Sequence, residues 1–168
     1  LYYYNLGRVQ YMMKKFTEAK YSFTTACQQN GNFAPSRYNL GLTDNRLNDT
    51  KSALEEFRRA NDIDPRHERS YLEEGRILSS QKDYAGAISA YQNVLRINST
   101  NRAALNELGS VYYQAKKYPE AENTFRQSLA MLEAGNEDSM TCYNLSTVLF
   151  EEGKIADALS YAKKAYDS

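Results

Sequence analysis

The feature that most constrains this sequence is a period of 34 residues. Three columns follow it through four successive copies: a glycine, an alanine and an aromatic residue. Their members are Gly7, Gly41, Gly75 and Gly109; Ala19, Ala53, Ala87 and Ala121; and Phe23, Phe57, Tyr91 and Phe125. A weaker fifth copy follows 37 residues further on, with Ser146, Ala158 and Ala162 in the same columns. Self-similarity at such a period is typical of a repeat architecture.

Each copy has the pattern of two helices. In the fourth, apolar residues recur at spacings of three and four on both sides of a break at residues 116–119. We therefore expect helices over residues 2–13, 16–29, 34–47, 50–63, 68–81, 84–97, 102–115, 118–133, 139–152 and 155–167. The helix at 118–133 should be the longest, because it must take up most of the three extra residues before the fifth copy.

Local signals at the predicted helix ends agree with this division. Asp49 and Asp83 stand where a helix N-cap is expected, since a carboxylate there can accept a backbone N–H. Pro119 suits a first helical position, where a missing N–H costs nothing. Pro65 separates the second copy from the third, because proline disfavours helix in the residue before it.

The order Leu-Gly, aromatic, Ala, Phe and Pro resembles the tetratricopeptide repeat. In the second copy the pattern is carried by Leu40, Gly41, Ala53, Phe57 and Pro65. The resemblance implies an all-α fold, a right-handed α-solenoid of five helix-turn-helix repeats in one domain over residues 1–168. The repeats would cover residues 1–33, 34–67, 68–101, 102–138 and 139–168, and each would bury one face against its neighbour.

The second copy departs from the pattern. Arg37, Asp44 and Thr50 stand where its siblings have larger apolar or aromatic residues, and Glu74 replaces the leucine before Gly75 in the third. We expect these changes to weaken local packing without altering the fold.

Composition bears on the class of partner. Lys plus Arg and Asp plus Glu number 21 each, so nothing in the overall charge attracts nucleic acid. No apolar run is long enough to insert in a membrane. The visible sequence has no targeting segment, which leaves the compartment unknown, with the cytoplasm slightly favoured. Because the chain opens with Leu1 rather than Met, we expect it to be a fragment of a longer protein.

Few residues could carry chemistry. His67 is the single histidine, and we expect it to be an exposed turn residue. Cys27 and Cys142 have no metal-site spacing and are expected to be small buried residues. Phosphate-binding loops and nucleophile motifs are missing from the sequence. We therefore expect no catalytic residue, metal or cofactor, and interpret the chain as a non-catalytic protein–protein interaction scaffold.

By resemblance, the first helix of each hairpin would line a concave groove that binds a peptide or protein. The residues so placed are Tyr4, Asn5, Arg8, Tyr38, Asn39, Leu42, Arg46, Arg69, Glu73, Arg76, Asn106, Glu107, Ser110, Tyr113, Tyr143, Asn144 and Thr147. The tyrosines of this set are expected on the surface, where tyrosine is favoured at interfaces. A solvated polar face without a ligand is the alternative interpretation.

One column of the predicted groove holds Asn5, Asn39 and Asn144, interrupted by Glu73 and Glu107. In related arrays, asparagines in this column bond the main chain of an extended peptide. We expect main-chain contacts at both ends and charge selection in the middle. The chaperone-binding subclass clamps a terminal carboxylate, which Glu73 would repel, so we exclude it.

Two alternatives to a peptide-binding adaptor remain open: a self-assembly module, and a regulatory or substrate-docking arm of a larger enzyme. The final helix carries Leu159, Ala162, Ala165 and Tyr166 where an earlier repeat would face the next hairpin. We expect weak self-association through this helix. Because these apolar positions are not followed by a polar capping helix, we also expect the parent array to continue past residue 168. Bulky Tyr2, in a column that is otherwise small, leads us to expect that the array begins near residue 1.

Overall fold

The computed structural model describes residues 1–132 and 138–167, and over these residues it contains ten α-helices and no β-strand. They are α1 (Tyr2–Met12), α2 (Phe16–Gln29), α3 (Ala34–Arg46), α4 (Thr50–Ile63), α5 (Glu68–Ser80), α6 (Tyr84–Ile97), α7 (Arg102–Gln114), α8 (Tyr118–Ala130), α9 (Ser139–Glu151) and α10 (Ile155–Asp167). The all-α fold is as predicted. Every helix also begins at its predicted residue.

The prediction that α8 is the longest helix was wrong. It has 13 residues, whereas α2, α4 and α6 have 14. The helix ends at Ala130 because the next N–H groups bond three residues back, Met131 to Ser128 O and Leu132 to Leu129 O. The last predicted residue, 133, lies outside the described residues.

The chain divides into two compact units, Leu1–Ile77 and Leu78–Ser168, which are described separately. We call them unit 1 and unit 2. The predicted single domain and its repeat boundaries stay predictions.

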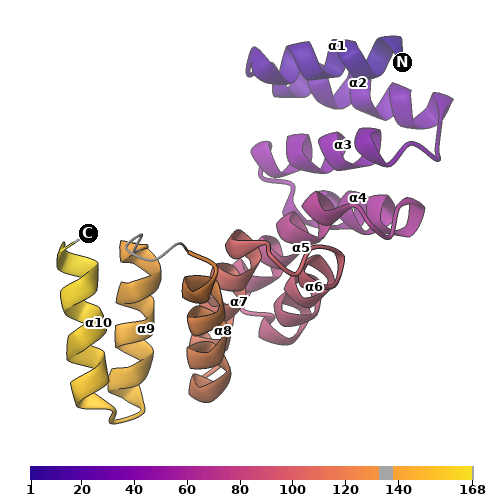
Figure 1. Cartoon of the computed structure of the whole chain (residues 1–168). Coiled ribbons are helices and arrows are strands. Elements are labelled where there is room, and N and C mark those ends of the chain that lie inside the picture. The colour runs from indigo at the N-terminus through magenta and orange to yellow at the C-terminus, as the bar shows by residue number, and fades with distance from the viewer. Residues whose placement is uncertain (133–137, 168) are drawn as a thin grey trace. The chain divides into compact units, whose positions relative to one another are not determined.

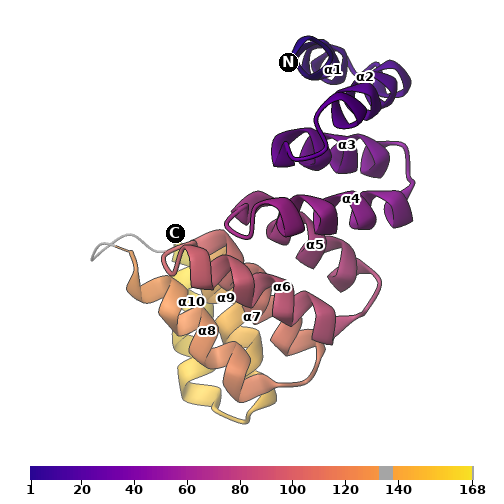
Figure 2. The same ribbon diagram turned by 90° about the vertical axis from the view of Figure 1, so that its right-hand side faces the viewer.

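In unit 1, α1 packs on α2, α2 on α3 and α3 on α4, and these helices follow one another as a stack in both views (Figure 1, Figure 2). The repeated glycine lies against the repeated aromatic residue of its own hairpin. A Cβ atom on Gly7 would lie 2.8 Å from the ring of Phe23, and one on Gly41 would lie 2.8 Å from the ring of Phe57. Both rings are completely buried. Glycine is therefore required because the ring fills the space of a side chain.

Two of the three residues that depart from the pattern in the second repeat, Arg37 and Asp44, form ion pairs. Arg37 donates through Nη1 to the buried Glu56 at 3.0 Å, and Asp44 accepts from Lys20 at 2.7 Å. The expected loss of apolar contacts is thus accompanied by ion pairs that link α2, α3 and α4. These pairs line a polar cleft of about 370 Å³.

Glu74 also finds polar partners within unit 1. Its carboxylate accepts from Arg58 Nε and from Asn61 Nδ2, both at 3.0 Å. These two bonds join the N-terminal half of α5 to α4. The residue that departs from the leucine of the repeat pattern therefore connects successive hairpins through hydrogen bonds.

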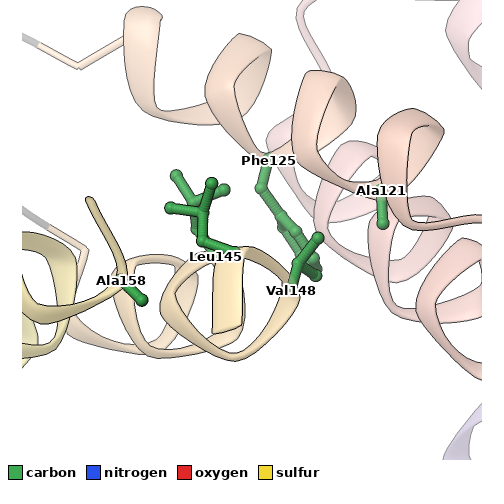
Figure 3. Close-up of a cluster of buried hydrophobic side chains, with 6 residues drawn as sticks. Ala121, Phe125, Leu145, Val148 and Ala158 are labelled. Carbon is green, nitrogen blue, oxygen red and sulfur yellow. The ribbon is translucent and has the colours of Figure 1, made fainter. Parts of the chain in front are cut away.

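In unit 2, α6 packs on α7, α7 on α8, α8 on α9 and α9 on α10. A buried apolar cluster joins the last three of these helices, with Phe125 of α8 facing Leu145 and Val148 of α9 (Figure 3). Ala121 and Ala158 lie at the same cluster, and their small side chains allow the helices to approach closely. Gly109 repeats the arrangement of unit 1, since a Cβ atom there would lie 2.7 Å from Phe125.

The predicted caps are confirmed. Asp49 accepts from the N–H of Ser52 at 3.2 Å, and Asp83 from that of Gly86 at 3.0 Å. Asn101 and Asp138 cap α7 and α9 in the same way. Pro119 is the second residue of α8 rather than the first, a position whose N–H also has no partner within the helix.

Candidate partner-binding surface

The first helices of the hairpins in unit 2 enclose a groove of about 310 Å³. Its lining consists of Ser110, Tyr113 and Gln114 from α7, Phe125 from α8, and Tyr143, Asn144 and Thr147 from α9. The residues of α7 lie within about one turn, as do those of α9, so each helix contributes one face. Phe125 is 1% exposed and supplies apolar surface at the base. The groove is therefore apolar at its base and polar at its rim.

The rim offers hydrogen-bonding groups without charge. Ser110 and Thr147 donate their hydroxyl protons to carbonyls of their own helices, which leaves each oxygen able to accept. Within the described part of the chain, the Asn144 amide has no hydrogen-bond partner. Tyr143 is 60% exposed, whereas Tyr113 is half-buried with its ring 5.9 Å from that of Tyr118. The pKa of Tyr113 is raised, first by desolvation and then by the carboxylate of Glu151.

The predicted site residues Tyr113, Tyr143 and Asn144 are thus brought together in one groove. Asn106 and Glu107 lie half-buried on α7 and do not line it. The prediction missed Gln114 and the base residue Phe125. Gln114 could have been found from its position four residues after Ser110, whereas Phe125 was assigned only to the core.

In unit 1, the predicted surface tyrosines are partly core residues. The ring of Tyr4 lies 5.1 Å from that of Phe33, and the ring of Tyr38 lies 5.8 Å from that of Phe57. Both tyrosines are half-buried. The expectation that they sit on the surface rather than in the core is therefore only partly right for these two side chains, as it is for the half-buried Tyr113.

The arginines of the predicted set lie exposed on the first helices of unit 1. Arg8 lies over the ring of Tyr4, with 5.7 Å between its Cζ and the ring centroid. Arg46 donates through Nε to the hydroxyl of Tyr11 at 3.1 Å. The prediction missed this role of Tyr11, which had been interpreted only as part of the repeat pattern.

Two arginines come from α5. Arg76 donates through Nη1 to Glu73 of the same helix at 2.8 Å, and Arg69 lies at the start of the helix. The predicted charge selection by Glu73 therefore involves a carboxylate that is already paired.

The asparagine column is not uniform. Asn5 is exposed, and Asn144 lines the groove of unit 2. Asn39 is half-buried, and its Nδ2 donates to the carbonyl of Pro35 at 2.7 Å. One of its donors is thus used within α3. The three asparagines therefore differ in how freely their amides can hydrogen-bond the main chain of a peptide.

His67 is not the exposed residue that was expected. It is half-buried, with Nδ1 2.7 Å from Ser70 Oγ and its ring 5.1 Å from that of Tyr38. Desolvation lowers the pKa of the imidazole. Both cysteines are buried, as predicted. Within residues 1–132 and 138–167, no group of three His, Cys, Asp or Glu side chains could hold a metal. None of the described helices combines the length and apolar character needed to cross a bilayer.

Sequence comparison identifies the class of protein. A family model described as tetratricopeptide repeat matches residues 66–134 and again 100–168, and a second one with the same description matches residues 34–67. These matches cover more than half of the chain, and it belongs to the tetratricopeptide repeat family. Proteins of this class are protein–protein interaction scaffolds, which are typically non-catalytic.

Curated relatives are much longer than this chain. The anaphase-promoting complex subunit 6 of Arabidopsis thaliana is 26% identical over 167 residues, which are 98% of this chain and 31% of the relative. The protein O-mannosyl-transferase TMTC3 of Homo sapiens is 27% identical over 130 residues, which are 77% of this chain and 14% of the relative. The chain thus spans about a third of the first relative and less of the second.

Solved structures share the fold. A crystal structure of MamA has a TM-score of 0.88 and 18% identity, and the match covers 96% of this chain and 92% of that one. YrrB, described as a TPR protein with an unusual peptide-binding site, has a TM-score of 0.84 and 18% identity, covering 98% and 84%. At such identities the likeness concerns the fold alone.

Proposed function

We propose that this chain binds an extended peptide segment of a protein partner on the surface of its first helices, without catalysing a reaction. The observation that carries the proposal is the groove of unit 2, where Tyr113, Tyr143 and Asn144 converge over Phe125. An apolar base can hold a side chain of the ligand, and an uncharged polar rim can orient the ligand's backbone through hydrogen bonds.

Four of the seven lining residues have an identifiable part in this binding. The Asn144 amide presents one donor group and one acceptor, so it can bond both an N–H and a C=O of a peptide main chain. Tyr113 and Tyr143 come from different helices of the groove, and their rings can hold an apolar or aromatic side chain above Phe125. The ligand is therefore a segment with a bulky uncharged residue at the point that meets the groove.

The groove chemistry favours recognition over catalysis. Its hydroxyls belong to Ser110, Tyr113, Tyr143 and Thr147, and its lining contains no histidine, lysine or carboxylate that could act as a base. The single histidine of the chain, His67, bonds Ser70. The relative TMTC3 is named as a transferase. In a parent protein of that kind, the same groove would serve as the docking site of a larger enzyme.

The test is a peptide selection. A random peptide library is selected on the immobilised chain, and the affinities of enriched peptides are measured by fluorescence anisotropy. We expect Asn144→Ala and Tyr143→Ala each to weaken binding about tenfold, since a central aromatic or amide anchor typically contributes this much or more.

The matched controls are Asn123→Ala and Tyr21→Ala, which remove exposed residues of the same types from the second helices α8 and α2. These controls should bind like the unsubstituted chain. Equal losses in the controls, or unchanged affinity in both groove variants, would contradict the proposal.

A second candidate function, self-association, is favoured by the exposed apolar surface of α9 and α10. Phe150, Leu159 and Tyr166 are largely exposed there, and Tyr166 reaches 90%. Together with Ile155 and Ala158, Phe150 and Leu159 line an apolar hollow of about 310 Å³. Sedimentation at rising concentration should show weak association that Tyr166→Glu abolishes, because a carboxylate cannot be buried cheaply. A chain that remains monomeric at every concentration would exclude this function.

A further inference from the structure

Four exposed arginines lie on the first helices of unit 1: Arg8 on α1, Arg46 on α3, and Arg69 and Arg76 on α5. Arg8 and Arg76 occupy the same column of the repeat, two periods apart. Equivalent residues of successive repeats point to the same side of an array. By this period Arg8 and Arg76 are equivalent to Ser110, and Arg46 to Gln114, both of which line the groove of unit 2. Arg69 is equivalent to Ala103, which does not line it.

Tyrosines hold two of these guanidinium groups. Arg8 lies over the ring of Tyr4, and Arg46 donates from Nε to the hydroxyl of Tyr11 at 3.1 Å. Neither contact neutralises the positive charge, and both leave the terminal nitrogens able to donate. A side chain that is already held in place loses less conformational entropy when a ligand binds. Arg8 and Arg46 are thus pre-organised donors.

Glu73 only partly balances the charge of these four arginines. It is bonded to Arg76 at 2.8 Å. The pKa of Arg46 is raised first by its hydrogen bond to Tyr11 and to a smaller extent by the charge of Glu73. In the part of the chain that the structure describes, no ion pair involves Arg8, Arg46 or Arg69.

This excess of positive charge is local. The whole chain has 21 basic and 21 acidic residues, and the groove of unit 2 is lined by uncharged side chains. If the chain attracted anions in general, its basic residues would be spread over the whole surface rather than gathered on one surface of unit 1. The concentration of arginine on the first helices of unit 1 instead indicates a ligand of opposite charge at that surface.

We propose that the first-helix surface of unit 1 binds an acidic peptide segment, with Arg8 and Arg46 as the principal donors to its Asp or Glu carboxylates. The inference rests on the proposed peptide-binding function and names the class of partner. Carboxylates suit the arrangement because the guanidinium groups come from three helices. Guanidinium groups from three helices can donate to several carboxylates along an extended peptide, whereas binding one phosphate would require them to gather around a single point.

The experiment has two parts. First, peptides selected from the random library on the unsubstituted chain are sequenced and compared with those selected on an Arg8→Gln, Arg46→Gln double variant. Second, the affinity of a short labelled peptide of alternating glutamate and glycine is compared with that of its glutamine counterpart. Lys51→Gln is the matched control, because Lys51 is an exposed cation on the second helix α4.

We expect an excess of Asp and Glu among the peptides selected on the unsubstituted chain and its disappearance in the double variant. The glutamate peptide should bind more tightly than the glutamine peptide and lose about fivefold in affinity for each arginine removed. Its affinity should also fall with added salt, because exposed charges are screened. Thermal unfolding of each variant confirms that it remains folded.

Three results would overturn the inference: no acidic excess, an excess that persists in the double variant, or equal binding of the two labelled peptides. If selected peptides lack acidic residues but lose affinity in Asn144→Ala, the proposed function stands and only the acidic partner is excluded. If no peptide is selected and neither labelled peptide binds, both proposals fail.

Discussion

The Nζ of Lys20 lies 2.7 Å from Oδ1 of Asp44, a carboxylate that is 2% exposed. Burial raises the pKa of Asp44 even with this lysine beside it. Removing the lysine would leave a buried charge without its partner, whereas removing the carboxylate would leave a lysine that still reaches solvent and Asp49. The two halves of this ion pair should therefore differ in their effect on stability.

We predict that Lys20→Met lowers the free energy of unfolding by about 2 kcal/mol, while Asp44→Leu changes it by less than about 1 kcal/mol. Leucine occupies the column of Asp44 in two other repeats, at Leu78 and Leu149. Urea denaturation measures both values, with Lys51→Met as the control for loss of an exposed lysine. If Asp44→Leu lowered the free energy of unfolding more than Lys20→Met, the prediction that the buried carboxylate depends on its lysine partner would be wrong.

A second prediction concerns the contact between glycine and phenylalanine. A Cβ atom on Gly109 would lie 2.7 Å from the buried ring of Phe125, so Gly109→Ala should lower the free energy of unfolding by about 1–3 kcal/mol. The control is Gly31→Ala, where the nearest heavy atom to a new Cβ is 3.9 Å away. Thermal or urea unfolding compares the two. Equal stability of both variants would mean that Phe125 moves aside at little cost.

The tyrosines of the first helices should separate into two classes. Tyr38 packs against Phe57 and His67, so Tyr38→Ala should lower the free energy of unfolding by about 2–3 kcal/mol. Tyr143 is mainly exposed, and Tyr143→Ala should cost less than about 1 kcal/mol. Urea unfolding tests this difference. If the two alanine variants were equally stable, Tyr38 would be the surface residue that the sequence predicted.

A fourth prediction uses pH. Burial lowers the pKa of His67 below its usual 6.5, so the folded chain favours the neutral imidazole. The unfolded chain takes up a proton first, and the contribution of His67 to stability is lost as pH falls below about 6.5. The drop in unfolding free energy between about pH 7.5 and pH 5.5 should be smaller in His67→Gln than in the unsubstituted chain. An identical drop in both would show that His67 is as solvated when folded as when unfolded.

The sequence by itself determined the helices. Their first residues follow from the 34-residue period, the caps at Asp49 and Asp83, and the proline signals, all of which act within a few residues. The repeated glycine and aromatic columns determined the family. Helix formation is a local process, so the pattern needs no knowledge of distant contacts.

Only the tertiary structure decided what the side chains do on those helices. Three of these features involve residues from different helices: the ion pair between Lys20 and Asp44, the hydrogen bond between Arg46 and Tyr11, and the packing of Tyr38 on Phe57. The groove of unit 2 likewise exists because α7 and α9 lie beside each other above Phe125. These features depend on how neighbouring helices approach one another, which the period of a sequence does not specify, because a repeat fixes equivalent positions but not the partner each position meets.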